Sequence, residues 1–315
     1  MESIYKEKAK ILVKNLLWDI YEKKQAESKY HFPGNISTDT AYMIFRDEYN
    51  GLFSYVEMCM RYVSHAIEHG KMPIIDMTGC RNPYVKEGDE GKINWWNLYF
   101  EQPFSEKNSA LDYTNIQKCE YDDSCGVPYG RSAVLLKKSR WYWGKIYEQY
   151  FHLNKDSEKY VENDWKKLFG DSKCTVLGVK VRGTDYKVVK HHPIQPSVDQ
   201  VIKEVKKVQS KFDKILVESE EYANIEIFKK AFPGKVIANE DNTYFDVKDA
   251  NSADRAMFEV KGAEYQSGLE YLASIMLLSK CDGLIGGVNG GTIAATYING
   301  GKYRYNKLIY LGVGE

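Results

Sequence analysis

Residues 175–185 read TVLGVKVRGTD, and this stretch decides which fold the chain adopts. Its first seven residues are mostly β-branched and apolar, which is typical of a strand buried on both faces of a sheet. Such strands occur in parallel sheets, because crossover helices cover both faces there. The stretch therefore predicts an α/β fold.

Strands and helices alternate regularly after this stretch. Pro196 and Ser197 begin a helix whose apolar residues, from Val198 to Phe212, recur at helical spacing. This alternation predicts a parallel sheet covered on both faces. Further strands are predicted at residues 214–217, 235–238, 283–286 and 307–310, and further helices at 221–232, 268–281 and 290–298.

The first half of the chain is less regular. An opening helix is predicted over about residues 3–25, and a helix that ends near Gly70 leads into a short strand at 72–77. Residues 79–131 are rich in Asp, Gly, Asn and Tyr and predict loops near a binding face.

The domain organisation follows from these elements. Residues 132–168 predict one long helical stretch that bridges two domains. We expect two Rossmann-like domains that face each other across a cleft. The first, residues 1–170, includes the bridging helix and would bind the acceptor, and the second, residues 171–315, would bind a nucleotide.

Composition places the chain among globular proteins. Of its 315 residues, 43% are hydrophobic and 28% are charged, which suits a sizeable core and excludes a disordered or fibrous chain. Lysine and arginine number 44, and so do aspartate and glutamate. Because the net charge is zero, no nucleic-acid partner is predicted.

The sequence also predicts the compartment. The most apolar N-terminal segment, residues 11–20, contains Lys14 and Asp19, so neither a signal peptide nor a transmembrane segment is predicted. Six scattered cysteines without a metal-ligand spacing predict reduced thiols, and hence a cytoplasmic protein.

Polar residues directly follow the first strand of the second domain, at the end where ligands bind to open α/β sheets. Arg182 offers a planar donor that suits a phosphate, and Gly183 beside it lets the backbone approach closely. Lys180 and Thr184 flank this pair, and Asp185 would orient the guanidinium or accept a substrate hydroxyl. A surface ion pair between arginine and aspartate is the alternative interpretation.

A second candidate site is the sequence GGVNGGT at residues 286–292, between a strand and a helix. Glycines allow a tight turn, and unpaired N–H groups at a helix start attract an anion. Asn289, Gly290, Gly291 and Thr292, whose hydroxyl is a further donor, are therefore candidate phosphate ligands. No lysine follows the last glycine, so this is not a Walker A loop, and a turn without a ligand is the alternative.

Two other groups follow strands. Adjacent histidines rarely share a metal ion, so we expect His192 to pack in its loop or to contact an acceptor. Glu218, Glu220 and Glu221 would touch a ribose or a base. A solvated first helical turn is the interpretation we favour for these glutamates, because acidic residues suit that position.

Taken together, these motifs resemble those of the GT-B fucosyltransferases of the α1,6- and protein O-fucosyltransferase superfamily, which includes the rhizobial nodulation enzymes. In that family a strand ends in His-x-Arg-Arg-x-Asp, and His-Pro-Ile and a helix follow. Here the strand ends with KVRGTD at residues 180–185, and residues 192–194 are His-Pro-Ile.

Two further segments carry the resemblance. The sequence LSKCD at residues 278–282, followed by the glycine loop, resembles the later family segment Leu-Ser-x-x-Asp with its small-residue loop. In the first domain, NWWNLYFE at residues 94–101 is similar to Asn-x-Trp-Glu-x-Tyr-Phe, although an aromatic run of this kind is usually core. The likeness covers residues 176–311 well and residues 51–101 loosely.

The chain departs from the family pattern at several positions. Lys180 stands where the family has histidine, and Gly183 where it often has a second arginine. Lys190 takes the approximate place of a glutamate proposed as a base, Ser274 that of an aspartate of the nucleotide site, and Asn289-Gly290 that of two serines.

The resemblance implies a GT-B fold and an inverting, metal-independent glycosyltransferase. It would transfer a sugar from a GDP-sugar, with GDP-fucose as the expected donor, to a glycan acceptor such as a cell-envelope polysaccharide. Lys180, Arg182, Gly183, Thr184, Glu218 and residues 289–292 would bind the donor, and Asp185, His192 or the donor phosphate would accept the proton. Two alternatives stay open: a GT-B enzyme with another nucleotide-sugar, and a catalytically silent nucleotide- or glycan-binding protein.

Overall fold

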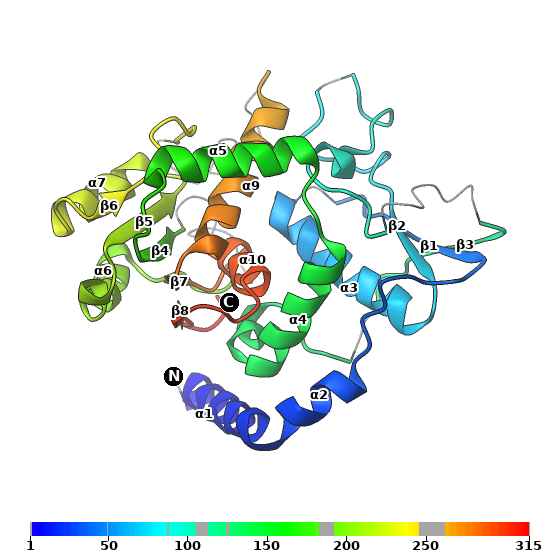
Figure 1. Cartoon of the computed structure of the whole chain (residues 1–315), viewed down its shortest axis with the longest axis horizontal. Coiled ribbons are helices and arrows are strands. Elements are labelled where there is room, and N and C mark those ends of the chain that lie inside the picture. Colours follow the sequence, from blue (N-terminus) through cyan, green and yellow to red (C-terminus); the bar gives the residue numbers. More distant parts are fainter. Residues whose placement is uncertain are drawn as a thin grey trace. The chain divides into compact units, whose positions relative to one another are not determined.

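The computed structural model describes residues 2–48, 50–86, 88–104, 113–123, 126–182, 192–245 and 262–314. Three candidate site residues, Gly183, Thr184 and Asp185, lie outside these ranges, as does Lys190. The chain divides into two compact units, unit 1 from Met1 to Glu158 and unit 2 from Lys159 to Glu315 (Figure 1). Each unit contains a parallel sheet, so the expected α/β fold is confirmed.

Unit 1 contains a sheet in the order β2-β1-β3, formed by β1 (Thr40–Ile44), β2 (Met72–Ile75) and β3 (Asn115–Lys118). The helix α3 (Leu52–Glu68) connects β1 to β2, as the predicted helix and strand require. The sequence did not predict β1 or β3. All four residues of β3 are exposed, so this strand has no apolar pattern by which a sequence would reveal it.

The core of unit 1 is aromatic. Trp95, Trp96, Tyr99 and Phe100 are at most 1% exposed, so their interpretation as core is confirmed. They belong to or follow the short 3-10 helix η2 (Trp95–Leu98). Asn94 begins that helix and ties it to β2, because its amide group donates to the Ile75 carbonyl at 2.8 Å and accepts from Met77 N–H at 3.0 Å.

The predicted opening helix is present and longer than expected. It consists of α1 (Glu2–Leu17), a π-helical turn η1 (Trp18–Glu22) and α2 (Lys23–Lys29).

The prediction of a single bridging helix over residues 132–168 is wrong. The chain forms a 3-10 turn η4 (Arg131–Leu135), then α4 (Lys137–Tyr150) and α5 (Lys155–Phe169). The break has a local cause, because Asn154 begins α5 by accepting a hydrogen bond from Ser157 N–H at 2.9 Å.

Unit 2 contains a five-stranded parallel sheet in the order β6-β5-β4-β7-β8. The predicted strands are confirmed, with small differences at their ends. Their bounds are β4 (Val176–Val181), β5 (Lys214–Ser219), β6 (Val236–Ile237), β7 (Gly283–Gly287) and β8 (Tyr305–Ile309). The helices are α6 (Val198–Lys206), the 3-10 turn η6 (Gln209–Lys211), α7 (Tyr222–Ala231), α9 (Glu264–Lys280) and α10 (Gly290–Ile298).

Helices cover both faces of this sheet (Figure 1). On one face Val179 of β4 and Val217 of β5 pack with Val205 of α6 and Phe228 of α7. On the opposite face the strands approach α9 closely, since a Cβ built at Gly178 would lie 2.9 Å from Leu278. Both faces of β4 are therefore buried, as its apolar sequence predicts.

Gly286 of β7 lies close to the backbone of β4. A Cβ at Gly286 would lie 2.8 Å from the Lys180 carbonyl oxygen and 2.9 Å from Thr292 Cγ2. Only glycine fits at position 286. Because it has no side chain, the end of β4 lies against the start of α10.

We expect Gly286→Ala to lower the free energy of unfolding by about 1–3 kcal/mol, because the new methyl group meets backbone that must shift. Gly79→Ala is the matched control, since its Cβ would meet no atom within 4 Å, and we expect it to change stability by less than about 0.5 kcal/mol. Urea unfolding of both variants measures the difference. Equal stabilities would contradict the close approach.

Candidate functional site

The candidate site lies where the strand order of unit 2 reverses. The chain runs outward from β4 through β5 to β6, and then returns to the other side of β4 for β7 and β8. Ligands of open α/β sheets bind at the carboxyl ends of the strands beside such a reversal. Lys180 pairs in register with Glu218 on one side and Gly286 on the other, so the candidate residues of three strands meet at this edge.

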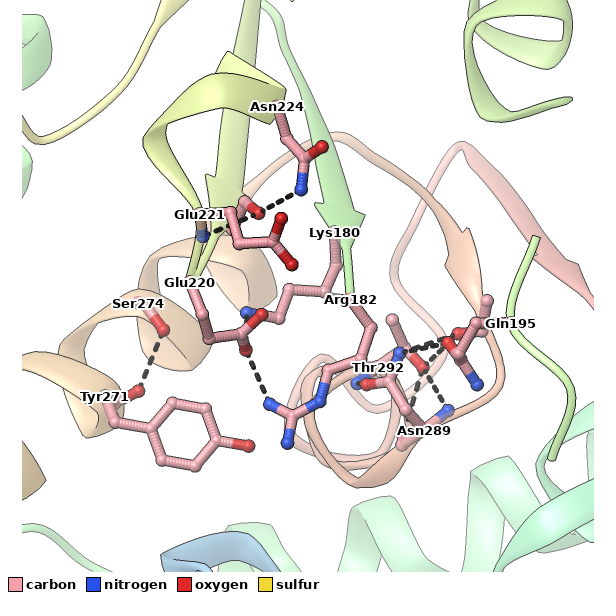
Figure 2. A network of polar contacts seen from close by, with 12 residues as sticks. Lys180, Arg182, Gln195, Glu220, Glu221, Asn224, Tyr271, Ser274, Asn289 and Thr292 are labelled. Carbon is pink, nitrogen blue, oxygen red and sulfur yellow. Dashed lines mark hydrogen bonds and ion pairs between the residues drawn. The ribbon is translucent and has the colours of Figure 1, made fainter. Parts of the chain in front are cut away.

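Lys180 and Arg182 converge on one carboxylate (Figure 2). Lys180 Nζ donates to Glu220 Oε1 at 2.8 Å, and Arg182 Nη1 donates to the same oxygen at 2.6 Å. The three side chains are 2%, 6% and 12% exposed. The result is a nearly buried cluster with two cations and one carboxylate at the end of β4.

Burial opposes the ionisation of Glu220, but the two cations outweigh it. Arg182 and Lys180 hold the pKa of the Glu220 carboxyl far below its ordinary value. The interpretation of Glu218 and Glu220 as a solvated helix start is therefore wrong. The residues that pair with Glu220 lie on another strand, which the sequence around the glutamates does not reveal.

The pKa of the Glu218 carboxyl is shifted in the opposite direction. Its side chain lies on the same face as Lys180, and desolvation raises the pKa of its carboxyl to about 8, with Lys180 opposing the rise. Its Oε1 is buried and has no hydrogen-bond partner among the described residues. Glu218 is therefore protonated at neutral pH. The charges of Lys180, Arg182, Glu218 and Glu220 then sum to +1.

The segment at residues 286–292, which we call the glycine turn, begins at the end of β7 and is stabilised by hydrogen bonds of its own side chains. Asn289 Oδ1 accepts from Thr292 N–H and Thr292 Oγ1 accepts from Asn289 N–H, both at 3.1 Å, and Thr292 Oγ1 also contacts the Gly287 carbonyl at 2.6 Å. The Thr292 hydroxyl thus stabilises the turn, contrary to the expectation that it donates to an anion. Within the described part of the chain, the backbone N–H groups of Gly290 and Gly291 make no hydrogen bond at this helix start.

The loop that carries His192 is attached to the same turn. Gln195 donates to the Val288 carbonyl at 2.8 Å and accepts from Asn289 Nδ2 at 3.1 Å. The His192 carbonyl accepts from Gly314 N–H at 3.0 Å, and Pro193 forms a bridge with Val313. His192 is thus positioned by backbone contacts to the C-terminal segment, while Gln195, which sequence reasoning missed, joins its loop to the glycine turn.

Tyr271 of α9 is a further residue that sequence reasoning missed. Lys180 Nζ lies 5.9 Å from the centre of its ring, and a Cβ at Gly291 would lie 3.5 Å from its hydroxyl. Tyr271 therefore lies between the cation cluster and the glycine turn, and no motif marks it in the sequence. Ser274, one helical turn away, is buried and donates to the Tyr271 carbonyl at 2.9 Å.

Unit 1 contains a cavity of about 400 Å³. Tyr30 and Pro33 line it from the segment before β1, Glu68 lines it from the end of α3, and Tyr142 lines it from the middle of α4. Because α3 leads from its end into the start of β2, this cavity lies at the amino ends of the strands and away from the edge where α/β ligands bind. Across the ranges that the structure describes, no three His, Cys, Asp or Glu side chains are grouped so as to hold a metal ion.

At the level of sequence, no protein-family model and no curated protein matches the chain. Solved structures do match. A NodZ α-1,6-fucosyltransferase co-crystallised with GDP is 15% identical, with a TM-score of 0.51, over 83% of this chain and 92% of that one. NodZ from Bradyrhizobium matches equally well, over 93% of its length.

A second protein of this kind also matches. POFUT1 in complex with GDP-fucose is 10% identical, with a TM-score of 0.50, over 88% of this chain and all of that one. The chain therefore has the fold of the GT-B fucosyltransferases, and the resemblance inferred from its motifs is confirmed at the level of the fold.

We expect Glu220→Gln to lower the free energy of unfolding by about 3–5 kcal/mol, because it removes the carboxylate that both buried cations contact. Glu240→Gln is the matched control. Its ion pair with Lys229 is exposed, so we expect its loss to change the stability little. If urea unfolding showed similar losses of stability in the two variants, Glu220 would not compensate the charges of Lys180 and Arg182.

The raised pKa of Glu218 predicts a pH dependence of stability. The folded chain keeps this proton up to about pH 8, whereas the unfolded chain releases it above the ordinary value of 4.5. Rising pH between these values therefore favours unfolding, by up to about 1.4 kcal/mol per pH unit. Glu218→Gln should lose this slope in urea unfolding at several pH values, whereas Glu226→Gln, at an exposed position of α7, should keep it. An unchanged slope in Glu218→Gln would show that Glu218 ionises normally.

Proposed function

We propose that the chain is an inverting, metal-independent glycosyltransferase that transfers a sugar, with GDP-fucose as the donor, to a glycan acceptor. The observation that carries the proposal is the pair of buried cations, Lys180 and Arg182, held by Glu220 beside the glycine turn at the strand reversal. The fold shared with NodZ, crystallised with GDP, and with POFUT1, crystallised with GDP-fucose, supports the choice of donor.

The cation cluster suits the charge that such a reaction develops. When the bond between the sugar and the nucleotide breaks, negative charge grows on the β-phosphate of the leaving group. Arg182 and the N–H groups of Gly290 and Gly291 would stabilise that charge in a setting that needs no reorganisation, because Glu220 already holds the guanidinium. With Glu218 protonated, the charges of Lys180, Arg182, Glu218 and Glu220 sum to +1, a sign that suits a diphosphate.

The acceptor hydroxyl needs a group to take its proton. His192 lies on the loop that Gln195 attaches to the glycine turn, and this supports it as the candidate base. Asp185, which lies outside the described residues, and a phosphate oxygen of the donor are the other candidates. In an inverting reaction the acceptor hydroxyl attacks the sugar carbon from the face opposite the leaving nucleotide, and the base must reach that hydroxyl.

Thermal-shift titration with GDP, UDP, ADP and CMP, each with and without EDTA, tests the donor and the metal independence. We expect GDP alone to raise Tm, equally in both conditions. Arg182→Ala should bind GDP more weakly and lower kcat for GDP release from GDP-fucose with a glycan acceptor by about 10²–10³-fold. Arg304→Ala is the matched control, because its side chain is 59% exposed, and its kcat should not change.

Other outcomes replace the proposal by named alternatives. A response to UDP alone would keep the fold and change the donor. GDP binding without GDP release from any donor would identify a catalytically silent binding protein. Undiminished kcat in Arg182→Ala would overturn the mechanism.

A further inference from the structure

The first helix of the chain exposes an unusual number of large apolar side chains. We define the apolar stripe as Tyr5, Leu12, Val13 and Leu16 of α1 with Ile20 of η1, which are between 56% and 72% exposed. Their spacing of three, four and seven residues places them on one side of a helix. The neighbouring Leu17 and Tyr21 are 50% and 63% exposed.

The opposite side of α1 and of the turn η1 packs against the rest of unit 1. Trp18 is only 4% exposed, and its ring lies 5.7 Å from that of Trp141. Asn15 donates to the Leu135 carbonyl at 2.9 Å and accepts from Lys137 N–H at 2.7 Å. The helix is therefore packed in the fold on one side, and the apolar stripe lies on its solvent-exposed side.

Lysines border the stripe. At about 100° per residue, Lys8 lies beside one edge, and Lys6 and Lys10 lie beyond the other. With Lys14, Lys23 and Lys24, residues 2–24 carry six lysines against four acidic residues, a net charge of +2 in a chain whose total is zero, and the acidic Asp19 is paired with Lys137. The chain-wide balance thus conceals a local basic and apolar segment.

We propose that α1 and the π-helical turn after it form a docking surface for an anionic phospholipid membrane, with the helix lying in the plane of the headgroups. The apolar stripe would enter the boundary between headgroups and acyl chains, while the lysines at its edges contact the lipid phosphates. Tyr5 and Tyr21, near the two ends of the exposed face, have the amphipathic rings that suit a membrane interface. The proposal does not depend on the proposed glycosyltransferase activity.

The charges favour a membrane over a second copy of the chain. If two stripes packed together, the lysines along their edges would approach one another, and Asp19, an acidic residue of the same surface, is already paired with Lys137. An anionic surface instead provides a countercharge along both edges. No helix in the described ranges is long and apolar enough to cross a bilayer, so α1 would lie on the surface.

Flotation of the full chain with lipid vesicles tests the proposal. We expect binding to vesicles of equal parts phosphatidylglycerol and phosphatidylcholine, weaker binding at high salt, and little binding to phosphatidylcholine alone. Leu12→Asp with Leu16→Asp should weaken binding at least about tenfold. Lys8→Gln with Lys10→Gln should weaken it by roughly fivefold per lysine.

Matched controls lie in unit 2. Ile227→Asp replaces a side chain of α7 that is 41% exposed, and Lys203→Gln with Lys206→Gln removes two exposed lysines of α6, so neither should affect flotation. Absence of flotation with anionic vesicles would overturn the proposal, as would flotation that is insensitive to the α1 variants. A dimer in light scattering that Leu12→Asp with Leu16→Asp abolishes, without vesicle binding, would assign the stripe to a second copy instead.

Discussion

A single carboxylate, that of Glu220, makes the candidate site possible. Lys180 belongs to β4, the central strand of the sheet, and Arg182 directly follows it, so the strand carries both side chains into a nearly buried position. Buried cations are costly without a partner, and Glu220 supplies one to both. The glycine turn approaches β4 closely because Gly286 has no side chain to meet the Lys180 carbonyl.

Much of unit 2 was predictable from sequence, because its strands are buried on both faces and its helices have an apolar stripe. Ser197 and Asn289 begin helices at the expected places, and both form capping boxes. Unit 1 was less predictable. The strand β3 is exposed along its length, and the break between α4 and α5 depends on the side chain of Asn154 and not on a proline or glycine.

The site was predicted only in part, for a physical reason. Arg182 and the glycine turn are visible because their chemistry lies in contiguous residues at a strand end. Glu220, Gln195 and Tyr271 act through contacts with residues about 40 or more positions away, so only the strand order brings them into the site. One signal was present: cations at 180 and 182 and acids at 218 and 220 alternate on neighbouring strands, and alternate residues share a face.

The buried proton on Glu218 changes the charge of the whole molecule as well as that of its site. A count of side chains gives 44 cations and 44 anions, and it treats Glu218 as ionised at neutral pH. In the folded chain this carboxyl keeps its proton to about pH 8, whereas in the unfolded chain it does not. With respect to this group, the native protein is more electropositive than its own denatured chain. The shift at Glu218, taken alone, therefore moves the isoelectric point of the folded chain above that of the unfolded one and its electrophoretic mobility toward the cathode.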